Sequence, residues 1–96
     1  MTSKKRQELR KEAQQLKPII QIGANGLTSA VLKTITEAFN TRELLKIKIN
    51  REDNQDKKVV KEIAQIIEKK IKKSEIVYIV GTTIIIYKEN DNKNHK

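Results

Sequence analysis

The sequence predicts an α/β sandwich in which a four-stranded mixed sheet is flanked by helices, in the order α-β-α-β-α-β-β. Three observations predict this fold class. Apolar residues recur at three- and four-residue steps in three segments, which is typical of amphipathic helices. Short β-branched runs make up four other segments. The length of 96 residues fits one modest hydrophobic core, so we expect a single domain over residues 1–88.

The N-terminal segment is expected to form a helix over about residues 4–15. The side chains at helical spacing form a thin stripe of Arg6, Leu9, Ala13 and Leu16. Pro18 ends the helix, because proline biases the residue before it away from the helical region. A β-branched run follows and predicts the first strand, at Ile19, Ile20 and Ile22.

The middle of the chain predicts a second helix and a second strand. Thr28 or Ser29 is the expected N-cap of the helix, which ends near Asn40. The apolar stripe of the helix is Val31, Leu32, Ile35, Ala38 and Phe39. In the strand, Leu45, Ile47 and Ile49 alternate with Lys46 and Lys48. This alternation predicts one buried face and one solvent-exposed face that carries the two lysines.

The last third predicts a long helix and a hairpin. The helix begins at about residue 56 and has a strongly basic outer face. Its apolar stripe is Val59, Val60, Ile63, Ile66, Ile67 and Ile71. Two β-rich runs, residues 76–80 and 83–87, are separated by Gly81 and Thr82, as in a tight hairpin. Residues 89–96 have little to bury and are expected to form a disordered tail.

The connections between these elements predict the arrangement of the sheet. Right-handed crossovers through helices should make the first three strands parallel, and the hairpin should add one antiparallel strand. The last two strands carry apolar residues on both alternations. Part of the sheet is therefore expected to be covered on two faces.

The charge of the chain predicts a polyanionic partner. There are 21 Lys and Arg against 12 Asp and Glu, a net charge of +9. Residues 1–22 hold six Lys or Arg and two Glu, and residues 57–73 hold seven Lys and two Glu. Such an excess attracts polyanions, although solvated helix faces are often charged as well. The charge of residues 57–73, in the third helix, indicates a polyanion less clearly than that of residues 1–22. The lysines at the end of the third helix also complement its own dipole.

The inventory of reactive side chains predicts neither catalysis nor a cofactor. The chain has no Cys, and its one histidine, His95, lies in the expected tail. One acidic cluster exists, at Glu52, Asp53 and Asp56. A polar loop with a helix N-cap explains these residues better than a metal site does, so no metal is expected. No apolar run resembles a secretory signal or a membrane span, and a cytoplasmic location is expected.

The segment Gly23-Ala24-Asn25-Gly26 is the most informative part of the sequence, because it joins a predicted strand to a predicted helix. Glycine permits a positive φ and lets another backbone approach closely. The free amides of a helix N-terminus favour phosphate. An ordinary turn and a phosphate-contacting loop both fit this pattern, and the net positive charge of the first helix favours the phosphate-contacting loop. No nucleotide P-loop lysine follows, so ATP or GTP binding is not expected.

Aromatic residues are few, at Phe39, Tyr78 and Tyr87. Phe39 is expected in the core and the tyrosines are expected to pack in the hairpin. This scarcity argues against a sheet that stacks single-stranded bases.

The assembled motifs resemble the CRM domain, the chloroplast RNA splicing and ribosome maturation domain, in the stand-alone bacterial form typified by YhbY. The resemblance is carried by residues 16–28 (LKPIIQIGANGLT), residues 43–48 (ELLKIK) and the closing hairpin of Val80-Gly81-x-x-Ile84-Ile85-Ile86-Tyr87. It covers residues 4–88. It implies an RNA-binding module with a GxxG loop and, for stand-alone bacterial members, association with ribosomal RNA in precursors of the large (50S) subunit.

The resemblance places the RNA-contacting loop on Gly23, Ala24, Asn25 and Gly26. The basic residues expected to bind RNA are Lys4, Lys5, Arg6, Arg10, Lys11, Lys17, Lys46 and Lys48. Lys88 stands where Arg often follows the family tyrosine, and it keeps the charge without the bidentate geometry. We expect a monomer that binds RNA, with no membrane and no small-molecule substrate.

Two other functions compete with RNA binding. The protein would be an adaptor if the basic face of the third helix docked on an acidic ribosomal or assembly protein. It would bind membrane surfaces if its basic amphipathic helices lay on anionic lipid, but the core needs their apolar residues.

Overall fold

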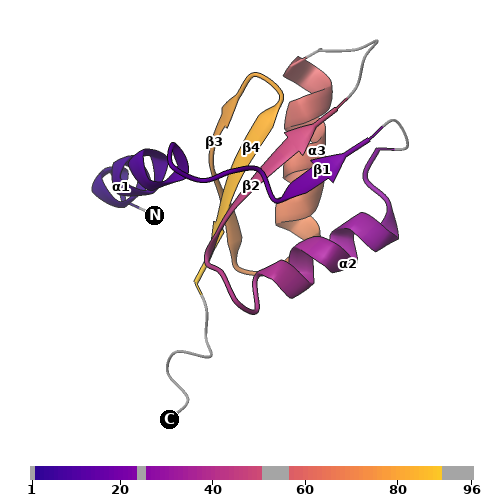
Figure 1. The fold of residues 1–96 in the computed structure, drawn as a ribbon, viewed down its shortest axis with the longest axis horizontal. Helices are drawn as coiled ribbons and strands as arrows, with labels where there is room; N and C mark the ends of the chain where they lie inside the picture. Colours follow the sequence, from indigo (N-terminus) through magenta and orange to yellow (C-terminus); the bar gives the residue numbers. More distant parts are fainter. Residues whose placement is uncertain (1, 24–25, 51–56, 90–96) are drawn as a thin grey trace.

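The computed structural model describes residues 2–23, 26–50 and 57–89. Within these residues the secondary-structure elements follow the predicted order (Figure 1). They are α1 (Ser3–Ala13), β1 (Ile20–Ile22), α2 (Ser29–Ala38), β2 (Leu44–Ile49), α3 (Lys57–Lys70), β3 (Ser74–Val80) and β4 (Thr83–Lys88). The acidic cluster, His95 and most of the expected tail lie outside the described residues.

Threonine hydroxyls cap the first two helices. The side chain of Thr2 accepts a hydrogen bond from the Lys5 amide at 3.1 Å, and that of Thr28 accepts one from the Val31 amide at 3.2 Å. Each bond satisfies one of the amides that a helix start leaves unpaired. Thr28, not Ser29, is therefore the N-cap of α2. α1 ends at Ala13, two residues before the predicted limit.

The strand order in the sheet is β1-β2-β4-β3. β1 pairs parallel with β2, and β4 pairs antiparallel with both β2 and β3. The first three strands therefore run in one direction, as expected, but β2 and β3 are not neighbours. The connection through α3 places β3 two positions away from β2 in the sheet. The hairpin then places β4 in the position between β2 and β3. β4 thereby becomes a central strand with hydrogen-bonded partners on both sides.

The two faces of the sheet are covered by different helices (Figure 1). α2 and α3 pack on one face over a core that includes Ile35, Phe39, Ile47, Ile67 and Ile84. α1 packs on the other face over a smaller cluster of Leu9, Ala13, Leu44, Val77 and Ile85. The prediction that part of the sheet is covered on both faces is confirmed. Consecutive residues of β4 face opposite cores, which explains its unbroken isoleucine run.

Charged side chains close the outer edge of β3 around a bulge between Ile76 and Tyr78. The Ile76 amide donates to Oε2 of Glu68 on α3 at 3.0 Å. Nη1 of Arg6 on α1 donates to the Val77 carbonyl at 2.7 Å and more weakly to the Ile76 carbonyl at 3.4 Å. Helices from both faces of the sheet thus meet backbone groups that an edge strand would otherwise leave unpaired.

Candidate nucleic-acid interface

One end of the sheet collects the turns that carry the glycines. The Asn50 amide donates to the Ile22 carbonyl, and the Ile49 amide donates to the Thr82 carbonyl, both at 2.8 Å. The ends of β1 and β2 therefore lie beside the hairpin turn between β3 and β4 (Figure 1). We call this the loop end, and it is marked by Gly23, Asn50, Gly81 and Thr82.

The glycine turn after β1 is held by a backbone hydrogen bond and is accessible to solvent. The Gly26 amide donates to the Gly23 carbonyl at 3.0 Å, which is the bond that closes a four-residue turn. Gly26 has φ +72°, a conformation that favours glycine. A Cβ added at either glycine would meet nothing within 4 Å. A second backbone can therefore approach this turn. The other two predicted loop residues, Ala24 and Asn25, lie outside the described residues.

α1 crosses the sheet from β3 to β2 and is anchored at both ends by cations. Arg6 bonds to β3 near the helix start, as described above. At the other end, Nζ of Lys46 on β2 donates to the carbonyls of Ala13 at 3.4 Å and Leu16 at 3.2 Å. The Ala13 carbonyl, at the end of α1, also accepts from the Leu16 amide at 3.0 Å, so the ammonium adds to the bonds that hold the end of the helix against β2. The helix leaves a hollow on each of its two sides.

The loop-end hollow has a volume of about 400 Å³. The residues that line it come from α1 and three strand segments and are Arg10, Gln14, Lys46, Tyr78, Val80, Thr83 and Ile85. Two of them are cationic and none is acidic.

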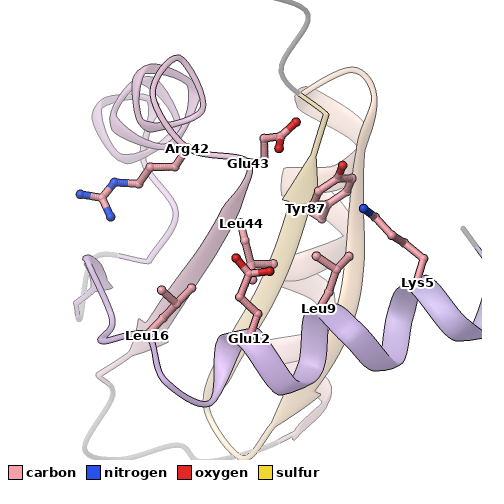
Figure 2. Close-up of a pocket in the computed structure, with 8 residues that line it drawn as sticks. All are labelled: Lys5, Leu9, Glu12, Leu16, Arg42, Glu43, Leu44 and Tyr87. Carbon is pink, nitrogen blue, oxygen red and sulfur yellow. The ribbon is translucent and has the colours of Figure 1, made fainter. Parts of the chain in front are cut away.

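The far-end hollow, on the other side of α1, has about 280 Å³ and is shown in Figure 2. Its lining residues are Lys5, Leu9, Glu12, Leu16, Arg42, Glu43, Leu44 and Tyr87. Two cations and two carboxylates share this space. The carboxylates repel a polyanion in the far-end hollow, whereas the charged side chains of the loop-end hollow only attract it. The loop end is therefore the better site for phosphate.

α1 leaves one row of side chains uncovered between the loop-end hollow and β1. In the sheet register, Gln21 pairs with Lys48, Lys48 with Thr83, and Thr83 with Val80. The row crosses all four strands on the α1 face, because the residues that alternate with it are buried on the other face. Nδ2 of Asn50 donates to Oε1 of Gln21 at 2.8 Å, which leaves the Gln21 amide nitrogen free to donate outward. The row offers hydrogen-bond donors and one ammonium to a ligand.

The structure separates the predicted basic residues into two groups. Lys4, Lys11, Lys17 and Lys48 are exposed. The others also contact the fold: Lys5 lies over the Tyr87 ring at 5.3 Å, Arg10 lies over the Tyr78 ring at 4.6 Å, and Arg6 and Lys46 bond to carbonyls. The expectation that Lys46 lies on a solvent-exposed face is wrong. The end of α1 covers this part of β2, and Lys46 is half-buried against it.

This separation predicts that substitutions of two nearby lysines affect different properties, RNA affinity for Lys48 and stability for Lys46. Lys48→Gln should lower RNA affinity about two- to threefold and reduce the slope of log K against log salt by about 0.7–0.9, the value of one lost phosphate contact. Lys46→Gln should instead lower the free energy of unfolding by about 1 kcal/mol, because it loses the bonds to α1. Fluorescence anisotropy at several salt concentrations and urea unfolding measure the two effects. A reduced salt slope in Lys46→Gln would show that its ammonium also contacts phosphate.

Sequence reasoning missed several residues of the interface. Gln14 lines the loop-end hollow, and Gln21 lies in the uncovered row. Val80 lines the same hollow at 54% exposure. A lone polar residue or valine gives no signal in a single sequence, because its role depends on where α1 crosses the sheet.

The described residues contain no group of three His, Cys, Asp or Glu that could hold a metal ion. Within the same residues, no helix has the length and apolar character needed to cross a membrane.

The sequence matches the model of the CRS1 / YhbY (CRM) domain family over residues 1–88. The chain is a member of this family. It is 36% identical over 90 residues to "Probable RNA-binding protein YqeI" of Bacillus subtilis (strain 168), with 94% of this chain and 90% of the relative covered. It is 31% identical over 91 residues to an "RNA-binding protein" of Haemophilus influenzae, with 95% and 88% covered.

A solved structure confirms the α/β fold of this CRM-domain chain. The solution structure of a hypothetical protein from Staphylococcus aureus matches with a TM-score of 0.76 and 33% identity, and the match covers 95% of this chain and 91% of the other. The prediction that the chain is not an enzyme is confirmed by its family.

Proposed function

We propose that this CRM-domain protein binds RNA, and specifically ribosomal RNA in precursors of the large (50S) ribosomal subunit during assembly. The observation that carries the proposal is the cation-only hollow and row beside the open turn of Gly23 and Gly26. The names of the relatives support RNA as the partner. The ribosomal part follows from the resemblance to stand-alone bacterial CRM proteins. In this proposal the protein acts as a cytoplasmic monomer.

Binding would combine a directional contact with a general attraction. The Gly23–Gly26 turn would bring backbone amides close to a phosphate or sugar, near the positive end of α2. The exposed lysines of α1, Lys4 and Lys11, with Lys17 and Lys48, would attract the RNA without reading its sequence. Lys5, Arg6 and Arg10 would keep α1 in place while their charge adds to the field.

The adaptor function has less support from the structure. Exposed residues of α3 include Lys61, Lys69 and Lys70, but also Glu62 and Glu68. Glu68 bonds to β3, and the rest of this face mixes both signs. A face of mixed sign is typical of an ordinary solvated helix.

Crosslinking in cells followed by sequencing of the attached RNA tests the proposal. We expect enrichment of large-subunit ribosomal RNA. In vitro, affinity for that RNA should fall steeply with salt, with a slope of roughly −3 to −4 if about four phosphates are neutralised. Crosslinked RNA without ribosomal enrichment would contradict the ribosomal role. Retention on ribosomal proteins after ribonuclease treatment would favour the adaptor instead.

A further inference from the structure

We propose that the loop-end hollow receives one unpaired nucleobase of the bound RNA. The inference depends on the proposed function and adds to it the RNA feature that is recognised, namely a base that has left the stack in a bulge or loop. The hollow of about 400 Å³ falls within the range of roughly 300–1,000 Å³ that is usual for ligand pockets.

The floor of the hollow suits the face of a base. It is formed by the buried Ile85, the half-buried Tyr78 and the exposed Val80. At 54% exposure, Val80 is the most exposed large aliphatic side chain in the described part of the chain. The Arg10 guanidinium covers the Tyr78 ring at 4.6 Å, and guanidinium planes are surfaces on which unstacked bases lie in RNA complexes. A base placed here would cover apolar surface that the fold leaves in water.

The rim of the hollow suits the edge of a base. The Gln14 amide supplies two donors and an acceptor, and the Thr83 hydroxyl supplies one donor and accepts as well. These groups can pair with the exocyclic and ring atoms that an unpaired base exposes. A lipid acyl chain or an apolar peptide would leave the same groups without partners.

The surroundings of the hollow suit the backbone on either side of that base. Arg10 lines one side, and Lys48 stands in the uncovered row on the other. The row leads from Gln21 on β1, beside the glycine turn, to Val80 on β3. Three strand spacings separate β1 from β3, which is about 14 Å. A strand that contacts the turn can therefore follow the row and place its next unpaired base in the hollow.

A fully paired helix does not fit this arrangement. Its bases are stacked inside the duplex, and the major groove of an RNA helix is too narrow for side chains to read. The far-end hollow does not fit either, because Glu12 and Glu43 would lie against the phosphates. The geometry thus distinguishes RNA with an unpaired base from RNA without one.

The experiment compares three labelled RNA stem-loops that share the same stem. The first carries one unpaired adenosine in the stem, the second carries an abasic nucleotide at that position, and the third is fully paired. Wild-type protein should bind the first about tenfold more tightly than the other two, as measured by anisotropy. Gln14→Ala and Val80→Ala should bring this ratio close to one, because each removes a contact to the base alone.

Ile66→Ala is the matched control. Ile66 on α3 is 44% exposed and lies on the other side of the sheet, so its loss should leave the ratio at about tenfold. Equal affinity of wild type for the three RNAs would overturn the base site and leave the proposed RNA binding standing. A ratio that persists in the Gln14→Ala/Val80→Ala double variant would also overturn it. Absence of binding to any RNA, ribosomal fragments included, would overturn both proposals.

Discussion

Gly26→Asp is expected to lower RNA affinity by at least about tenfold, whereas Gly26→Asn should leave it within about threefold. Both side chains tolerate the left-handed conformation that Gly26 adopts at φ +72°, at a cost of about 1 kcal/mol. A Cβ at this position meets no neighbour within 4 Å, so neither variant is expected to clash. The two differ in one charge, and about 1.4 kcal/mol of repulsion at a phosphate is enough for a tenfold loss.

The stability of these two variants should run in the opposite direction to their affinity. Position 26 precedes the N-terminus of α2, where a carboxylate interacts favourably with the helix dipole. Gly26→Asp should therefore be at least as stable as Gly26→Asn. Urea unfolding together with an anisotropy titration on ribosomal RNA measures both properties. Equal affinity of Gly26→Asp and wild type would show that this turn does not contact the RNA.

Leu9→Ala is expected to release α1 from the sheet and to weaken RNA binding about tenfold. α1 buries only Leu9 and Ala13 fully, and Leu→Ala substitutions at buried sites cost about 2–5 kcal/mol. A loss of that size is comparable to the whole free energy with which so small an apolar contact can hold α1 on the sheet. Without α1, the loop-end hollow loses one wall, and the cations of the helix are no longer held beside the glycine turn.

Ile35→Ala is the matched control for this prediction. Ile35 is fully buried in the core cluster of the opposite face, which is separate from the cluster that contains Leu9. Its loss should lower the free energy of unfolding by a similar amount and leave the affinity of the folded protein unchanged. Hydrogen exchange should show faster exchange confined to residues 3–13 in Leu9→Ala. Simultaneous loss of protection throughout the chain would contradict separate release of α1.

Most of the fold follows from local patterns in the sequence. The alternation of Leu45, Ile47 and Ile49 predicted β2, and the spacing of Leu9 and Ala13 predicted the buried side of α1. The position of β4 between β2 and β3 was not predictable in this way. A hairpin can add its second strand on either side of the first, and this choice depends on which position the α3 crossover leaves open.

The candidate site was predicted less completely, because its shape depends on where α1 crosses the sheet. The alternation that placed Lys46 on the polar face of β2 was correct about the face. It could not show that the end of α1 covers that face at Lys46 and leaves Lys48 exposed. The tyrosines were expected to pack in the hairpin, and both pack against the α1 cluster. Their contacts with Lys5 and Arg10 have no signal in the sequence, because the partners are about 70 to 80 residues apart along the chain.

The closed edge of β3 has a consequence for how several copies of the protein can occupy one RNA. Proteins held close together on a polymer reach high local concentrations, at which an open edge strand would pair with that of a neighbour. At Ile76 the outward amide and carbonyl are already bonded to Glu68 and Arg6. A second chain therefore finds no strand to extend at this point. Copies crowded on one RNA can therefore lie side by side without pairing their β3 strands at Ile76.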